Sequence, residues 1–88
     1  MTELEKARQT INDVDKQMAE LFEQRMDAAR IVAEYKKENG LKIDDFAREE
    51  QIIAKNTSLI KDEDYKSYYV NFLKETITLS KLLQHRLL

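Results

Sequence analysis

The chain has 88 residues, with 17 acidic and 15 basic side chains and a formal net charge of −2 at pH 7. Because both signs are interspersed, the charge argues against nucleic-acid binding as the main role. The absence of Cys excludes disulfides and thiolate metal sites, and the single His85 excludes a histidine metal cluster. No apolar run is long enough for a membrane span and no signal-peptide pattern is present, so we expect a cytoplasmic protein.

One Gly, no Pro and abundant Glu, Lys, Leu and Ala predict an all-helical fold with few turns. A chain of this length is expected to form one domain, residues 1–88, whose single core is marginal by itself. Oligomerisation is a common remedy for such a small core.

The first predicted helix covers residues 2–39, from the capping residue Thr2 to the stop signal Asn39-Gly40. Apolar side chains recur at alternating spacings of three and four, which is the period of one helical face. They are Leu4, Ala7, Ile11, Val14, Met18, Leu21, Ala28, Val32 and Tyr35. Arg25 occupies the position between Leu21 and Ala28 where an apolar residue is due. A charge there is costly unless something pairs with it, either a core carboxylate or a ligand.

This helix is expected to be roughly 55 Å long. A compact chain of this size has a radius of gyration of about 12 Å, hence a diameter near 30 Å. The helix would therefore extend well beyond its own domain, and its apolar stripe needs a second surface. We expect a homodimer in which a second copy of the chain covers this stripe, because closed symmetric dimers are the commonest soluble oligomers. A lone coiled-coil rod is the alternative.

The second predicted helix is capped by Asp44 or Asp45 and runs to about Lys55, where residues 56–58 break it. Its apolar positions are Phe46, Ile52 and Ile53. Charged residues share one of its faces with an apolar one: Asp45, Arg48, Glu49 and Ile52. Such a face is either an exposed network of ion pairs or part of a site.

The third predicted helix is capped by Asp62 or Asp64 and runs to near the C-terminus. Its apolar positions are Tyr65, Tyr69, Phe72, Leu73, Ile77, Leu83 and Leu87. Ser80 and Gln84 continue the face that carries Leu73 and Ile77, either as a buried hydrogen-bonding pair or as part of a frayed end. Three helices of unequal length are more than a rod would need.

The polar residues of the first helix divide into two groups. Arg25 and Lys36 are eleven residues apart, so they point the same way about 16 Å apart. Arg8 lies about 25 Å before Arg25 on a different azimuth. It can share a small pocket with Arg25 only across an antiparallel dimer. The alternatives are a solvated surface residue for Arg8 and a snorkelling side chain for Lys36.

The candidate polar residues limit the types of reaction that this chain could catalyse. It contains no Gly-rich phosphate loop and no plausible Ser-His-Asp arrangement, so hydrolytic, covalent and phosphoryl-transfer reactions are poorly supported. Two Arg side chains suit two carboxylates, because the guanidinium matches carboxylate geometry bidentately. A Lys and a Gln can donate to an oxygen that gains charge. We therefore expect a site that holds a small dianion in a reactive shape.

Over essentially its whole length the chain resembles the all-helical, AroQ-type chorismate mutases. The resemblance rests on motifs in order at near-constant spacing: Arg8-Gln-Thr-Ile-Asn-Asp-Val-Asp15, Leu21-Phe-Glu-Gln-Arg25, Lys36-Lys37, Asp45-Phe-Ala-Arg48-Glu49-Glu50 and Ser80-Lys-Leu-Leu-Gln84. It implies an intertwined homodimer of three-helix chains with two sites. The implied activity is the rearrangement of chorismate to prephenate in Phe and Tyr biosynthesis (the shikimate pathway), an isomerase reaction that needs neither cofactor nor metal.

The resemblance also implies roles for individual residues. Arg25 of one chain and Arg8 of the other would hold the two substrate carboxylates. Lys36 and Gln84 would donate to the ether oxygen as its bond to the ring breaks. Further roles would fall to Glu49 and Asp45 at the ring hydroxyl, to Arg48 in ordering these groups, and to Ser80 at a carboxylate.

One departure bears on the last helix. The segment before it is one residue shorter than in the family, so Thr76, one turn away, is the alternative to Ser80.

Two other functions remain open: an isochorismate pyruvate-lyase of the same fold, and a non-catalytic helical dimerisation module. The sequence does not predict whether Phe or Tyr inhibits the protein, or whether it docks onto another shikimate-pathway enzyme.

Overall fold

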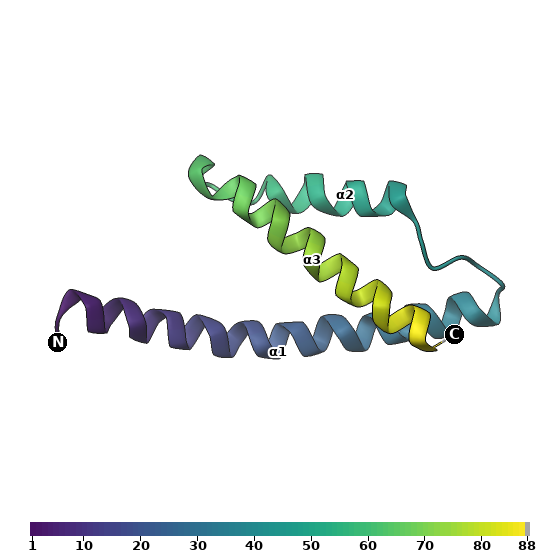
Figure 1. Cartoon of the computed structure of the whole chain (residues 1–88), viewed down its shortest axis with the longest axis horizontal. Coiled ribbons are helices and arrows are strands. Elements are labelled where there is room, and N and C mark those ends of the chain that lie inside the picture. Colours follow the sequence, from purple (N-terminus) through teal and green to yellow (C-terminus); the bar gives the residue numbers. More distant parts are fainter. Residues whose placement is uncertain (88) are drawn as a thin grey trace.

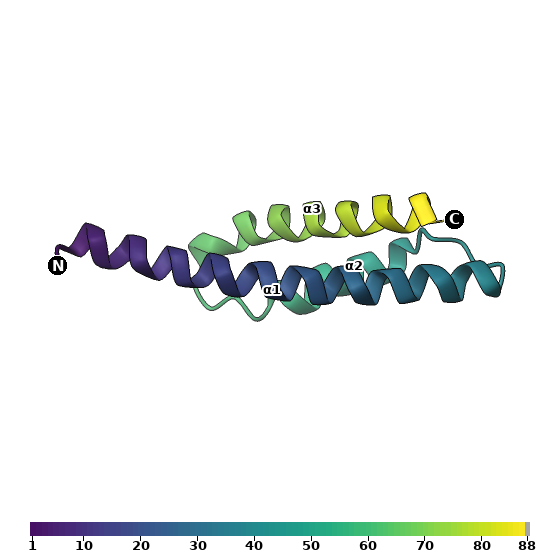
Figure 2. The same ribbon diagram turned by 90° about the horizontal axis from the view of Figure 1, so that it is seen from below.

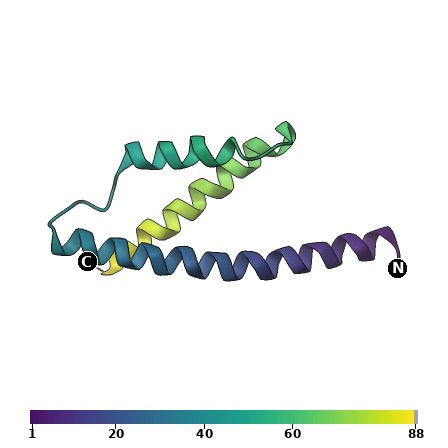
Figure 3. The same ribbon diagram turned by 180° about the vertical axis from the view of Figure 1, so that it is seen from behind.

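The computed structural model describes residues 1–87, which form three helices and no strand: α1 (Glu3–Glu38), α2 (Phe46–Thr57) and α3 (Glu63–Leu87). The predicted all-helical class is confirmed. Within these residues α3 packs against both other helices, whereas α1 and α2 do not meet. α3 runs diagonally from the end of α2 to the C-terminal half of α1 (Figures 1 and 3). None of the described helices combines the length and apolar character that a bilayer span requires.

Both ends of α1 follow the predicted capping signals. The Thr2 hydroxyl accepts a hydrogen bond from the backbone N–H of Glu5 at 3.1 Å. At the other end Gly40 has a φ of 65°, which L side chains rarely adopt. This conformation lets the N–H of Leu41 donate to the carbonyl of Lys36 at 2.8 Å, as in a Schellman motif. The chain is thereby turned back toward the helix it has just left.

We expect Gly40→Ala to lower the free energy of unfolding by about 1 kcal/mol, because an L residue is strained in the left-handed region. No atom lies within 4 Å of an added Cβ, so the expected cost is conformational and not steric. Gly40→Asn should cost less, since Asn tolerates this region. Urea unfolding measures both variants, and equal losses for Ala and Asn would contradict the conformational explanation.

The second and third helices are also capped by aspartates. Asp45 caps α2 by accepting from the N–H of Arg48 at 3.1 Å. Asp62 precedes α3 and accepts from the N–H of Asp64 at 2.9 Å. α2 ends at Thr57, two residues beyond the predicted Lys55. The prediction of a break at Asn56 was wrong because its side chain bonds to the carbonyl of Ile52 at 2.8 Å and stays within the last helical turn.

The core of the single chain is small. Its buried apolar side chains are Ala29, Ala33, Ile43, Leu73 and Ile77. The radius of gyration is 16.2 Å and the longest dimension 56 Å, against about 12 Å expected for the radius of a compact chain of this length. The single chain is therefore elongated, as the length of the first predicted helix implies.

The apolar stripe of α1 is largely uncovered. Leu4, Ile11 and Leu21 are 58%, 56% and 60% exposed. The N-terminal part of α1 extends past the other two helices in both views of Figures 1 and 2. Phe46 and Tyr65, which were predicted on apolar faces, are also exposed in the single chain. The single chain therefore leaves a long apolar stripe of α1 exposed to solvent.

Candidate active site

A cavity of about 320 Å³ lies in the space between α1 and α2, with α3 as its third wall. Its volume is at the lower end of the range for small-molecule sites. Its apolar lining consists of Ala28, Ala29, Val32, Ile43, Ile52 and Ile77. Its polar lining consists of Arg25, Lys36, Asp45, Arg48, Glu49, Ser80, Lys81 and Gln84. Four cationic and two anionic side chains therefore converge on one small volume.

Every site residue predicted from the sequence lines this cavity, except Arg8. Arg8 is exposed on the N-terminal part of α1, about 25 Å along the helix from Arg25. Ser80 lines the cavity, whereas Thr76 donates to the carbonyl of Phe72 at 2.9 Å and does not line it. Of these two alternatives only Ser80 lines the cavity, and which of them faces a substrate stays a prediction. The catalytic roles of all these residues remain predictions.

Arg25 is half-buried, and its guanidinium donates to the hydroxyl oxygen of Ser80. Ser80 is 5% exposed and its hydroxyl donates to the carbonyl of Thr76 at 3.1 Å. Among residues 1–87 no carboxylate lies within ion-pair distance of Arg25. The alternative of a buried ion pair with a core carboxylate is therefore wrong for the described chain. The positive charge of Arg25 faces the cavity without a neutralising anion.

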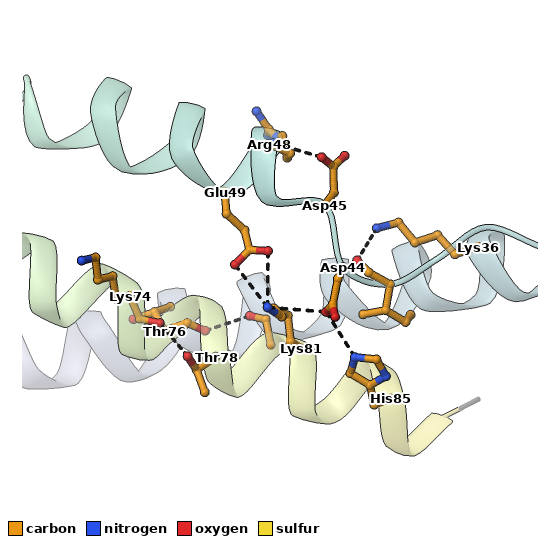
Figure 4. Close-up of polar contacts among 12 residues, drawn as sticks. Lys36, Asp44, Asp45, Arg48, Glu49, Lys74, Thr76, Thr78, Lys81 and His85 are labelled. Carbon is orange, nitrogen blue, oxygen red and sulfur yellow. Dashed lines mark hydrogen bonds and ion pairs between the residues drawn. The ribbon is translucent and has the colours of Figure 1, made fainter.

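Lys36 is held at the cavity by the loop that follows its own helix. Its ammonium donates to the carbonyl of Ile43 at 2.9 Å, which Figure 4 draws as a dashed line. Ile43 is 5% exposed, so burial of this side chain fixes the position of the carbonyl. A carbonyl is a neutral partner, and among residues 1–87 no carboxylate lies within ion-pair distance of Lys36. The turn at Gly40 therefore serves the placement of Lys36.

Gln84 lines the cavity and carries a buried polar atom that has no partner among the described residues. The residue is 9% exposed, and its Oε1 atom is buried without a hydrogen-bond partner among residues 1–87. Leaving a buried polar atom unpaired costs about 1–3 kcal/mol. Rotation of the amide by 180° exchanges its oxygen and nitrogen, so the same position can accept or donate.

A cluster of charges at the wall between α2 and α3 was missed by the sequence analysis. The Lys81 ammonium lies 3.3 Å from a Glu49 carboxylate oxygen and 3.4 Å from Asp44. His85 Nε2–H donates to the same Asp44 carboxylate at 3.3 Å. Lys81 follows Ile77 by four residues, so the helical period did place it on the cavity face. Its partners Asp44 and Glu49 are far away in the sequence, and only the packing of α3 brings them close (Figure 4).

Two groups of this cluster titrate away from their ordinary values. The hydrogen bond from His85, with help from Lys81, holds the pKa of Asp44 below 3.8, although burial acts in the opposite direction. Burial disfavours the charged form of Lys81, but the hydrogen bond and charge of Glu49, together with Asp44, outweigh it. The pKa of Lys81 is therefore raised above 10.5. Both groups are charged over the whole neutral range.

These directions predict how stability depends on pH. Because its pKa is lowered on folding, Asp44 stabilises the fold above pH 3.8, and this contribution disappears as the pH falls through the folded-state value. The Lys81 contribution is lost only above pH 10.5. We expect Asp44→Asn to be less stable than wild type at pH 7, with a difference that shrinks below about pH 4. Urea unfolding between pH 7 and pH 3 tests this, and a constant difference would contradict it.

The comparison with protein families agrees with this arrangement. The model of the family described as chorismate mutase type II matches residues 7–85, which is nearly the whole described chain. The chain belongs to this family. No curated protein and no solved structure matches the chain. The matched range includes the three helices almost entirely and every predicted site residue, Arg8 among them.

Membership of the chorismate mutase type II family confirms the resemblance inferred from the ordered motifs. The polar lining of the cavity consists of cations, carboxylates, a hydroxyl and an amide. Among residues 1–87 no three His, Asp or Glu side chains are grouped so that they could hold a metal ion. The cations facing the cavity instead favour a small anionic ligand.

Proposed function

We propose that this protein is a chorismate mutase that converts chorismate to prephenate on the way to Phe and Tyr. The observation that carries the proposal is the pair of cations, Arg25 and Lys36, that face one cavity while bonded only to neutral groups. Chorismate carries two carboxylates, and its rearrangement is unimolecular, so no nucleophile or cofactor is needed. Binding energy from the carboxylates can hold the flexible substrate in the compact shape that reacts.

Each cation has a distinct role in this proposal. The Arg25 guanidinium binds one carboxylate as a fork, and its bond to Ser80 fixes its orientation. Lys36 donates to the ether oxygen, which gains negative charge as its bond to the ring breaks. The Gln84 amide nitrogen, which also lines the cavity wall, donates to the same oxygen. Donors aimed at an atom that becomes charged stabilise the transition state more than the bound substrate.

The opposite wall of the cavity carries the group for the ring hydroxyl. Glu49 of α2 is half-buried and lines the cavity, and its carboxylate points toward Lys81 of α3 (Figure 4). A carboxylate only accepts hydrogen bonds, so it suits a hydroxyl donor. Asp45 caps α2 and Arg48 follows it on the same helical face. We assign Asp45 to support Glu49, and Arg48 to order the carboxylates and the substrate.

In this proposal the second substrate carboxylate is bound by a cation from a second chain. We propose that the partner's Arg8 fills this place in an intertwined homodimer whose α1 helices run antiparallel. The exposed apolar stripe of α1 supports this arrangement, since a second α1 helix would cover it. The start of one α1 would then pass the C-terminal part of the other, where Arg25 and Lys36 lie. The dimer thus completes both the core and the site.

The direct test follows the loss of chorismate absorbance with purified protein and identifies the product. Prephenate is the expected product. Pyruvate formation from isochorismate, with chorismate left intact, would instead indicate the pyruvate-lyase alternative. If both substrates survive, the polar residues are structural and the dimerisation-module alternative holds. Size measurement in solution is the companion experiment, and a monomer at micromolar concentration would contradict the proposed dimer.

A further inference from the structure

Lys81 is the one cation lining the described cavity whose charge is compensated by carboxylates. Its ammonium lies 3.3 and 3.4 Å from the two Glu49 carboxylate oxygens and 3.4 Å from Asp44. It also lies 5.1 Å from the centroid of the Phe46 ring. The side chains of Lys81 and Glu49 are 26% and 20% exposed, so solvent screens their interaction only in part. The Lys81 ammonium is therefore held by Asp44 in the loop before α2 and by Phe46 and Glu49 on α2.

The charge of Glu49 creates a difficulty for the proposed reaction. A dianionic substrate is repelled by a carboxylate in the same cavity, and the repulsion is stronger where water is excluded. Yet the proposed role of Glu49, accepting the ring hydroxyl, needs the ionised acceptor. A fixed cation behind the carboxylate resolves both requirements. It cancels the long-range repulsion and leaves oxygen lone pairs free toward the cavity.

We propose that Lys81 is a positioning residue that neutralises and orients Glu49, so that this carboxylate can face a dianionic substrate. The nearly equal distances to the two oxygens orient the carboxylate plane, and the contacts with Asp44 and Phe46 fix the ammonium in turn. This role rests on the proposed function. Lys81 is not assigned to a substrate carboxylate, because its charge is already shared between two protein carboxylates (Figure 4).

The test is a double-mutant cycle between Lys81→Met and Glu49→Gln, with KM and kcat for chorismate as readouts. In the wild-type background Lys81→Met should raise KM about tenfold and change kcat by less than about threefold, because the loss falls on binding of the anion. In the Glu49→Gln background the cavity-lining carboxylate that contacts Lys81 is absent, and Asp44, which does not line the cavity, keeps its contact with His85. There Lys81→Met should change KM less than about twofold.

Two further variants separate charge from packing. Lys81→Arg keeps the charge and should hold KM within about threefold of wild type. Lys74→Met is the matched control, since Lys74 lies two turns earlier on α3 and lines a neighbouring hollow instead of the cavity. It should leave both constants unchanged. If Lys81→Met does not fold by circular dichroism, Lys81→Gln takes its place, because it retains a polar side chain.

The outcomes separate this inference from the proposed function. An active wild type whose KM is unaffected by Lys81→Met overturns the role of Lys81 alone. Equal rises in KM in the wild-type and Glu49→Gln backgrounds also overturn it, since they indicate a structural contribution of the Lys81 side chain. A wild-type protein that leaves chorismate intact overturns both. A rise in KM that disappears in the Glu49→Gln background and is absent from Lys81→Arg supports the compensation of Glu49.

Discussion

Replacement of Lys36 by Ala is expected to lower kcat by at least about a hundredfold, which corresponds to roughly 2.7 kcal/mol of lost transition-state stabilisation. The ammonium is held 2.9 Å from the carbonyl of Ile43, so it is fixed before substrate binds. Charge accumulates on the ether oxygen only as the bond to the ring breaks. An interaction that strengthens in the transition state affects kcat more than binding. KM should therefore change much less than kcat.

Lys37→Ala is the matched control for this prediction. Lys37 is the next residue of α1, but it is exposed and does not line the cavity. The backbone turn survives in both variants, because Leu41 donates to the carbonyl of residue 36 and not to its side chain. Steady-state kinetics of both variants provide the measurement. A near-normal kcat for Lys36→Ala, or equal losses in the two variants, would exclude the proposed role of Lys36.

The ends of the helices and the position of Arg25 could be predicted from sequence because both depend on local rules. A Thr, an Asp or a Gly at a helix end acts through groups a few residues away, as Thr2 and Gly40 do. Arg25 stood out because it interrupts an otherwise regular apolar period. The end of α2 was misjudged by two residues, since a polar side chain can bond within its own helix as well as break it.

The charge cluster around Lys81 could not be predicted in the same way. The helical period places Lys81 on the same face as Ile77, but its partner Glu49 is 32 residues away on another helix. Only the crossing of α3 over α2 decides whether the two side chains meet. The surroundings of Phe46 depend on the same packing. Its ring is exposed in the single chain and lies beside the Lys81 ammonium of α3. Tertiary geometry of this kind is not contained in helical periodicity.

Arg8→Ala and Arg25→Ala are each expected to lower kcat/KM by at least about a hundredfold, because each removes a charged fork from one substrate carboxylate. The two inactive proteins should regain activity when they are unfolded together and refolded as a mixture. The reason is geometric. Arg25 lines the cavity of its own chain, whereas Arg8 lies about 25 Å away along the same helix and is exposed. In the proposed dimer each site takes Arg25 from one chain and Arg8 from the other.

In a mixed dimer one site then has both Arg residues and the other has neither. Random pairing makes about half of the dimers mixed, and half of their sites are intact, so about a quarter of wild-type activity should return. The control mixes Arg25→Ala with Gln84→Ala. Both residues line the cavity of a single chain, so every site in that mixture lacks one of them and activity should stay low. If activity stays as low in the Arg8 mixture as in the control, Arg8 and Arg25 act within the same chain and the proposed shared site is excluded.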